Sequence, residues 1–148
     1  MKTNLQPEPG TYILVLKVKT SQNIKTGKIG KYTVKKGYYI YVGSAHGPGG
    51  IKARVTRHLK KIKPKHWHID YLREAGSVIA VLINYSDKKK ESIWASNLSH
   101  FAFLSMPIEG FGSSDCSCPS HLFFCTDAFN IDVLNDIDKE PLELLKIL

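Results

Sequence analysis

Short apolar runs, separated by polar stretches, predict a small β-sheet in this chain. Residues 11–17 place tyrosine and leucine on one face and several β-branched side chains on the other, which is typical of a strand. Residues 78–85 are apolar almost without interruption, which indicates a strand buried on both faces. Residues 19–30 are polar and rich in glycine and lysine, so they predict a hairpin loop or a short excursion. Further strands are predicted over residues 30–34, residues 38–43 and Leu122–Cys125.

The helix predicted over residues 51–62 is the most informative element. Its apolar residues recur at about 100° per residue and form one stripe, made of Ile51, Val55, Leu59 and Ile62. Arg54, Arg57 and His58 fall together on the edge of this stripe. Pro64 ends the helix, because proline cannot continue its hydrogen bonds. Further helices are predicted over residues 67–74 and Glu91–Ser99.

The alternation of few short strands with helices predicts one α/β domain, in which a small, mostly antiparallel sheet is flanked by helices. A length of 148 residues fits a single core. We assign residues 1–126 to this domain and residues 127–148 to an acidic tail. Apolar residues recur at helical intervals in the tail, and Pro141 interrupts them. The tail is expected either to dock on the domain as a helix or to mediate self-association.

The net charge of +8 is spread unevenly along the chain. Seven lysine or arginine residues and no acidic residue lie between Lys52 and Lys65. Such a surface attracts a polyanion through counterion release; the alternative is a solvated face that keeps the protein soluble. No apolar run reaches the roughly 18–20 residues of a membrane span, the first nine residues lack a signal-peptide core, and three cysteines argue against a disulfide framework. A cytoplasmic protein without a membrane partner is expected.

Two tripeptides and three later residues carry candidate chemistry. Gly10-Thr11-Tyr12 opens the first predicted strand, and Tyr41-Val42-Gly43 closes a later one. Arg54, His58 and Glu91 follow in that order. This ordered set resembles the GIY-YIG nuclease superfamily. The stretches GYYIYVGSA, HWHIDYL and SDCSC at residues 37–45, 66–72 and 114–118 resemble a subgroup of that superfamily in archaea and bacteria, which is sometimes fused to base-excision-repair enzymes.

The resemblance implies a metal-dependent endonuclease that hydrolyses nucleic-acid phosphodiester bonds, connected with DNA repair and with a repair protein as a possible partner. Tyr12 is then the general base, helped by a neighbouring arginine, and Tyr41 holds the phosphate or tunes Tyr12. Arg54 offers a forked cation to the phosphate oxygens, and His58 orients or relays for the attacking water. Glu91 binds one Mg²⁺ or Mn²⁺ ion, since carboxylates are ligands that these ions prefer.

Contacts with nucleic acid, DNA before RNA, are assigned to Gly43, Arg57, Lys60 and Lys61. Each of these residues alone has an ordinary structural explanation, and only the ordered set favours function. One alternative is a nucleic-acid-binding module that has kept the scaffold without turnover. Another is an interaction domain with a structural zinc, because four soft ligands lie close together: Cys116, Cys118, His121 and Cys125.

The chain departs from the family pattern at two places. About 28 residues separate the two tripeptides, against about ten in the commoner pattern, so an extra hairpin is predicted between them. No clear equivalent follows Glu91 for the asparagine that many members carry beyond their glutamate helix. The candidates to replace it are Ser113, Ser114 and Asp115.

Overall fold

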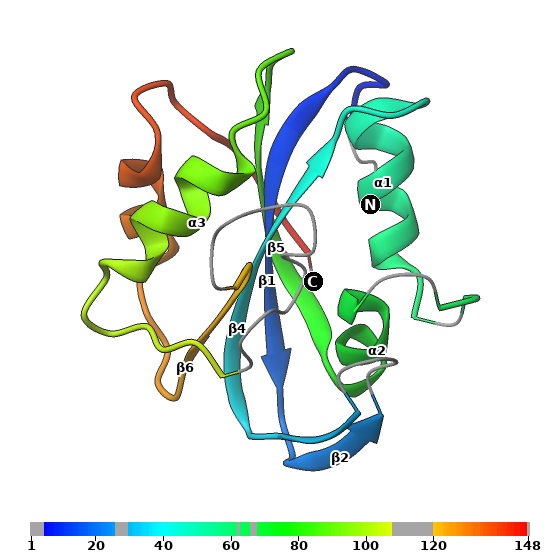
Figure 1. The fold of residues 1–148 in the computed structure, drawn as a ribbon, viewed down its shortest axis with the longest axis vertical. Coiled ribbons are helices and arrows are strands. Elements are labelled where there is room, and N and C mark those ends of the chain that lie inside the picture. Colours follow the sequence, from blue (N-terminus) through cyan, green and yellow to red (C-terminus); the bar gives the residue numbers. More distant parts are fainter. Residues whose placement is uncertain (1–4, 26–29, 62, 66–67, 108–119, 148) are drawn as a thin grey trace.

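Three nine-residue strands form the centre of one antiparallel sheet in the computed structural model, which describes residues 5–25, 30–61, 63–65, 68–107 and 120–147 (Figure 1). They are β1 (Gly10–Val18), β4 (Gly37–Ala45) and β5 (Ser77–Tyr85). The four-residue strands β6 (Leu122–Cys125) and β7 (Glu143–Lys146) form its edges, in the order β6-β4-β1-β5-β7. All neighbouring strands are antiparallel, which confirms the predicted fold class.

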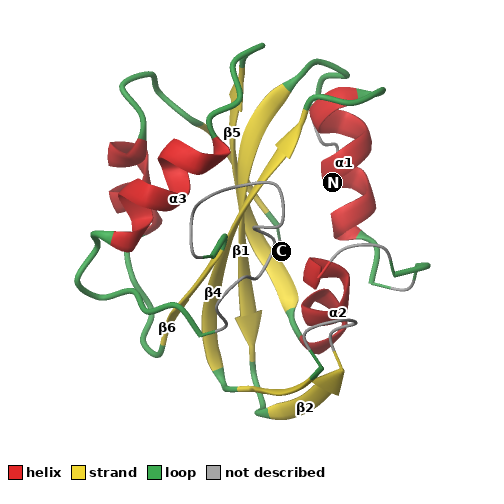
Figure 2. Cartoon of the chain, viewed as in Figure 1, coloured by secondary structure: helices red, strands yellow, loops and turns green. Residues whose placement is uncertain are grey.

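Helices cover both faces of this sheet (Figure 2). On one face, α1 (Gly50–Leu59) and α2 (His68–Ala75) pack over the even-numbered residues of β1. On the other face, α3 (Glu91–Ser99) and a 3-10 helix (Ile131–Ile137) pack over the odd-numbered residues. The described part of the chain contains no helix that is long and apolar enough to cross a membrane.

The extra hairpin predicted between the two tripeptides is confirmed. Strands β2 (Gln22–Lys25) and β3 (Lys31–Val34) pair with each other in a separate two-stranded sheet. The Gln22 side chain donates a hydrogen bond of 3.0 Å to the carbonyl of Ala75, which ties the hairpin to the end of α2. The insertion thus extends the molecule at the end of the sheet away from Gly10 and Gly43 (Figure 1).

Backbone carbonyls of the N-terminal segment accept hydrogen bonds from the first amides of α1. The amides of Ile51 and Lys52 donate to the carbonyls of Glu8 and Gln6 at 2.8 and 3.0 Å. Gly50 has a φ of +55°, and a Cβ there would collide with the backbone of Glu8. Because the first amides of a helix need such partners, this glycine-rich entry to α1 holds the N-terminal segment against the helix.

The other end of α1 differs from the prediction. The helix ends at Leu59 and not at residue 62, because Lys60 adopts an extended backbone. The Arg73 side chain donates hydrogen bonds to the carbonyls of His58 and Leu59, at 3.0 and 2.9 Å. These bonds satisfy carbonyls that would otherwise accept from a further helical turn.

The acidic tail is built into the fold, but as a 3-10 helix and a strand. In the helix Ile131–Ile137, the Asn130 side chain caps the start by accepting from the amide of Asp132. Beyond Pro141, β7 pairs with β5, and Leu144 lies opposite Leu82. The helical spacing of apolar residues is overridden there, because pairing satisfies the backbone groups at the edge of β5.

Candidate active site

The two tyrosines of the tripeptides lie on neighbouring strands and share one face of the sheet, as predicted. Tyr12 pairs across the strands with Gly43, and Leu14 pairs with Tyr41. Side chains alternate along a strand and agree across a pair, so Tyr12 and Tyr41 both face α1. Both are buried in the cluster that contains Ile51 of that helix.

Gly43 is explained by the ring of Tyr12. A Cβ at Gly43 would collide with the ring and the hydroxyl group of Tyr12. The φ of Gly43 is not positive, so the close approach of the ring and not an unusual backbone conformation requires glycine. The assignment of Gly43 to nucleic-acid contact stays a prediction.

A buried hydrogen bond joins Tyr12 to His58 of α1. The distance between the Tyr12 Oη and the His58 Nε2 is 2.6 Å, and each residue is 1% exposed. The pKa of His58 is lowered from 6.5 to about 3, mainly by burial; the charge of Asp70 opposes this shift, and nearby cations add to it. The imidazole is therefore neutral near pH 7. Because Arg54 forms a hydrogen bond with the Tyr12 hydroxyl and can only donate, the phenol proton is left for the Nε2 of His58, in the tautomer that carries its proton on Nδ1.

Arg54 lies beside this pair, half-buried on α1. Its Nη1 donates to the carbonyl of Ser44 at 2.8 Å. Burial and the neighbouring Tyr41 raise the pKa of Tyr12 well above 10, although the charge and hydrogen bonding of Arg54 lower it. Arg54 thus gives the expected help, but burial outweighs it, and Tyr12 is a protonated phenol at neutral pH.

Glu91 reaches the same site from the opposite side of the sheet. It is the first residue of α3, and its negative charge raises the pKa of both Tyr12 and Tyr41. Burial is the main cause of the raised pKa of Tyr41. β6 pairs with Tyr38–Tyr41 alone, so no other described strand covers the end of β4 on that side. Glu91 lies by this open edge, near His121.

His121 is a site residue that the sequence did not identify as part of this centre. Its Nδ1 lies 3.9 Å from the Oε2 of Glu91, and its carbonyl accepts from the amide of Val42 at 3.0 Å. Burial lowers the pKa of its imidazole, although the charge of Glu91 raises it. Thirty positions separate His121 from Glu91, and no local pattern connects them.

The zinc prediction stays untested, because Cys116 and Cys118 lie outside the described residues. His121 precedes β6 and Cys125 ends it, so the extended strand separates their backbones by about 13 Å. The Cys125 thiol donates to the carbonyl of Asp127. Within the described ranges, no group of three His, Cys, Asp or Glu side chains forms a metal cluster. Ser113, Ser114 and Asp115 also lie outside those ranges.

The cations assigned to nucleic-acid contact fall into two kinds. Arg57 binds both carboxylate oxygens of buried Asp70, at 2.8 and 2.9 Å, and links α1 to α2. Its contact with nucleic acid stays a prediction beside this structural role. Lys60 and Lys61 are exposed just beyond α1, and no ion pair engages them within the described residues.

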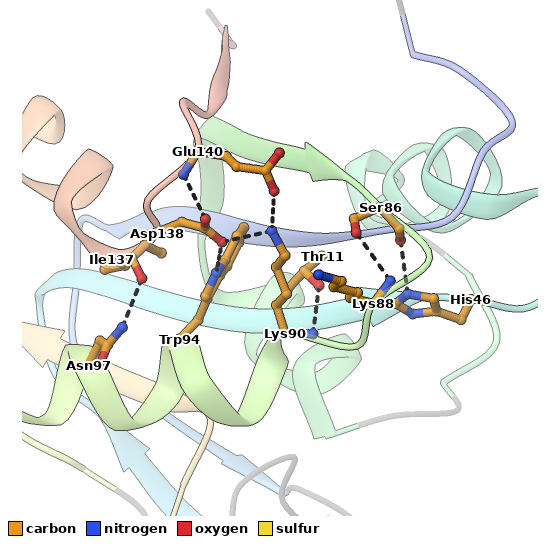
Figure 3. Close-up of polar contacts among 10 residues, drawn as sticks. All are labelled: Thr11, His46, Ser86, Lys88, Lys90, Trp94, Asn97, Ile137, Asp138 and Glu140. Carbon is orange, nitrogen blue, oxygen red and sulfur yellow. Dashed lines mark hydrogen bonds and ion pairs between the residues drawn. The ribbon is translucent and has the colours of Figure 1, made fainter.

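The tail anchors the helix that carries Glu91 (Figure 3). Asp138 accepts a hydrogen bond of 2.8 Å from the indole of Trp94, and Lys90 forms ion pairs with Asp138 and Glu140. The Asn97 side chain donates to the carbonyl of Ile137. Because Lys90 immediately precedes Glu91, these contacts fix where α3 begins. Docking of the tail was one of the two expected outcomes, but its anchoring of α3 was not predicted from the sequence.

Fold and site together define a small α/β domain with a phenol, an imidazole, a guanidinium and a carboxylate at one end of its sheet. The chain belongs to the family described as "Domain of unknown function DUF123", whose model matches residues 11–140. That span includes every residue of the site described above. No curated protein and no solved structure matches the chain.

Proposed function

We propose that this protein is a metal-dependent endonuclease of the GIY-YIG type, which hydrolyses phosphodiester bonds in DNA and acts in DNA repair. The observation that carries the proposal is the buried hydrogen bond of 2.6 Å between Tyr12 and His58. It places a proton acceptor behind a phenol, and Arg54 and Glu91 lie beside that phenol. Binding alone requires neither the buried pair nor the carboxylate.

The pair supports general-base catalysis by relay. The attacking water transfers a proton to the Tyr12 oxygen while Tyr12 passes its own proton to the Nε2 of His58. The water oxygen forms a bond to phosphorus, the bond from phosphorus to the leaving oxygen breaks, and solvent protonates that oxygen. His58 then returns its extra proton to solvent through Tyr12. No phenolate has to form in the resting site, where the pKa of Tyr12 is raised.

The low pKa of His58 suits a base that acts only when substrate is present. Burial holds this pKa at about 3 in the protein without substrate. A phosphodiester anion beside the pair favours the imidazolium and raises the pKa of His58, because opposite charges stabilise each other strongly where water is excluded. The guanidinium of Arg54 offers hydrogen-bond donors to the non-bridging oxygens, whose charge grows in the transition state.

Glu91 fits the role of metal ligand. Its side chain is 25% exposed, so an ion reaches it from solvent while the carboxylate remains near both tyrosines. Mg²⁺ usually keeps several waters and takes one or two protein carboxylates, so a single glutamate suffices. When bound, the ion supplies Lewis-acid stabilisation of charge on the phosphate.

A second candidate function is a nucleic-acid-binding module without turnover. Lys60 and Lys61, which are exposed beside α1, favour it. The two functions predict different results when Glu91 is removed. A binding module gains affinity for nucleic acid, because a negative charge near phosphate is lost, whereas the nuclease loses its metal ligand.

The test is a nicking assay on supercoiled and branched DNA with Mg²⁺ or Mn²⁺. We expect cleavage by the wild-type protein, none by Glu91→Ala, and unchanged cleavage by Glu74→Ala, which removes an exposed glutamate paired with Lys65. DNA affinity should persist in Glu91→Ala. Arg54→Ala should lower the rate by about 10²–10³-fold. Metal-dependent cleavage by Glu91→Ala at the wild-type rate, or no cleavage by the wild type, would contradict the proposal.

A further inference from the structure

His121 is held at the site by its backbone on both sides. Its carbonyl accepts from Val42 in β4, and Leu122 begins β6 directly after it. The hydroxyl of Ser120 accepts from the amide of Leu122 at 3.0 Å, which closes the turn into the strand. His121 is 2% exposed. The backbone of His121 is therefore fixed beside β4, and its imidazole is buried rather than displayed on the surface.

The spacing between His121 and Glu91 lies within the reach of two ligands of one ion. The Nδ1 and the Oε2 are 3.9 Å apart, which is too far for a hydrogen bond. Two donors that each lie about 2.1 Å from a shared ion can be at most about 4.2 Å apart. Adjacent ligands of an octahedral ion are about 3 Å apart, so a shift of about 1 Å in the side chains would bring both atoms onto the same ion.

We propose that Glu91 and His121 together form the metal site, and that this mixed site selects a divalent transition-metal ion such as Mn²⁺ over Mg²⁺. The inference shares Glu91 with the proposed function and adds a nitrogen ligand to it. Carboxylate oxygen suits both ions, but imidazole nitrogen suits first-row transition metals and binds Mg²⁺ poorly. A glutamate alone would discriminate little between the two.

The simpler alternative is that His121 only influences the position of Glu91 electrostatically, without contacting the ion. In that case the nitrogen does not touch the ion, and loss of His121 weakens Mg²⁺ and Mn²⁺ binding alike. Pulsed electron paramagnetic resonance of bound Mn²⁺ separates the alternatives, because it detects directly coordinated ¹⁴N.

The experiment uses the full chain without DNA and measures Mn²⁺ and Mg²⁺ affinity by calorimetry, together with the ¹⁴N signal. We expect the wild type to show directly bound nitrogen. His121→Ala should lose that signal and weaken Mn²⁺ binding by about tenfold or more, while Mg²⁺ affinity changes by less than about threefold. His100→Ala, which removes an exposed histidine at the far end of α3, is the matched control and should behave as wild type.

His121→Gln, which keeps most of the side-chain volume, replaces His121→Ala if circular dichroism shows that the alanine variant is unfolded. The inference is overturned if the wild type binds no Mn²⁺, if its spectrum lacks ¹⁴N, if the signal survives in a folded His121 variant, or if both metals weaken equally. Nicking without nitrogen coordination would remove this inference and leave the nuclease. Nitrogen coordination without nicking would support this metal site and contradict the proposed nuclease.

Discussion

The two faces of the central sheet are both buried, yet they are filled differently. Toward α3, β1 and β4 contribute Ile13, Val15, Ile40 and Val42, which pack against Trp94 and its neighbours. Toward α1, β1 contributes Leu14 and Leu16 together with Tyr12, and β4 contributes Tyr39 and Tyr41. The rings of Tyr12 and Tyr41 both lie beside His58. One pair of strands therefore serves an apolar core and a polar site at once, because consecutive side chains alternate between faces.

The apolar and the polar side chains in this sheet contribute to the free energy of folding in different ways. Apolar burial toward α3 contributes free energy with little directional demand. The polar groups toward α1 cost desolvation and recover it only through their mutual hydrogen bonds. Apolar burial on both faces holds the sheet together, and the polar end of the face toward α1 keeps the groups that the proposed catalysis needs.

The largest effect on stability is expected from Trp94→Ala, which removes the largest side chain of the apolar cluster toward α3. Loss of a fully buried aromatic side chain costs about 3–5 kcal/mol of the free energy of unfolding, and the hydrogen bond to Asp138 is lost as well. Urea unfolding measures the change. Ile93→Ala, at an exposed neighbouring position, should change stability by less than about 0.5 kcal/mol. Equal effects at the two positions would contradict the packing of α3.

Tyr12→Phe tests the polar face. Removal of the hydroxyl takes the donor away from the buried Nε2 of His58, at a cost of about 1–3 kcal/mol. The double variant Tyr12→Phe/His58→Leu should recover stability, because apolar replacement of both partners is nearly neutral. Both variants should lose nicking. If the double variant is no more stable than the single one, desolvation is not the main cost on this face.

The next prediction concerns the loss of folding stability at acidic pH. The pKa of His58 is about 3 in the folded protein and 6.5 without burial, so the unfolded chain binds more protons between those values. Stability contributed by neutral His58 is complete above pH 6.5 and is lost as the pH falls toward 3. The charged groups that act on it are Asp70, Lys63, Arg54 and Arg57. Urea unfolding at pH 7 and 4.5 should show a smaller acid loss in His58→Gln; an identical loss would exclude this origin.

The smallest expected effect is on the salt dependence of nucleic-acid binding by the basic surface. Arg57 is engaged with Asp70, Lys65 with Glu74, and Lys63 with the carbonyl of Lys60. About four of the seven cations in the basic stretch are therefore expected to contact phosphates, with a slope of log affinity against log salt of about −3.6. Lys60→Ala/Lys61→Ala should bring the slope to about −1.8. Lys19→Ala/Lys139→Ala, at exposed positions elsewhere, should leave it unchanged. A flat profile for the wild type would mean that the basic surface is merely solvated.

The sequence predicted those parts of the molecule that depend on local periodicity. The alternation in residues 11–17 placed β1, and the stripe of α1 placed Arg54 and His58 on one edge. The bounds of α3 and β6 were also correct. Each of these follows from spacing along the chain, which a single sequence contains.

Contacts that depend on tertiary structure could not be predicted. The approach of His121 to Glu91 depends on how far β6 extends along β4, and the pairing of β7 depends on the unfilled edge of β5. The direction of the pKa shift of Tyr12 depends on burial, which exceeds the effect of Arg54 only once α1 covers the sheet. No spacing rule carries such information.

The anchoring of α3 by the tail has a consequence for the order of synthesis. A ribosome that has just translated Ser99 has already made Tyr12, Arg54, His58 and Glu91, but not the segment that contains Asp138. A nascent chain of that length holds most of the site's functional groups without the contacts that position α3. We therefore expect the proposed nuclease activity to lag behind synthesis and to appear only after the segment that contains Asp138 has emerged and folded against α3.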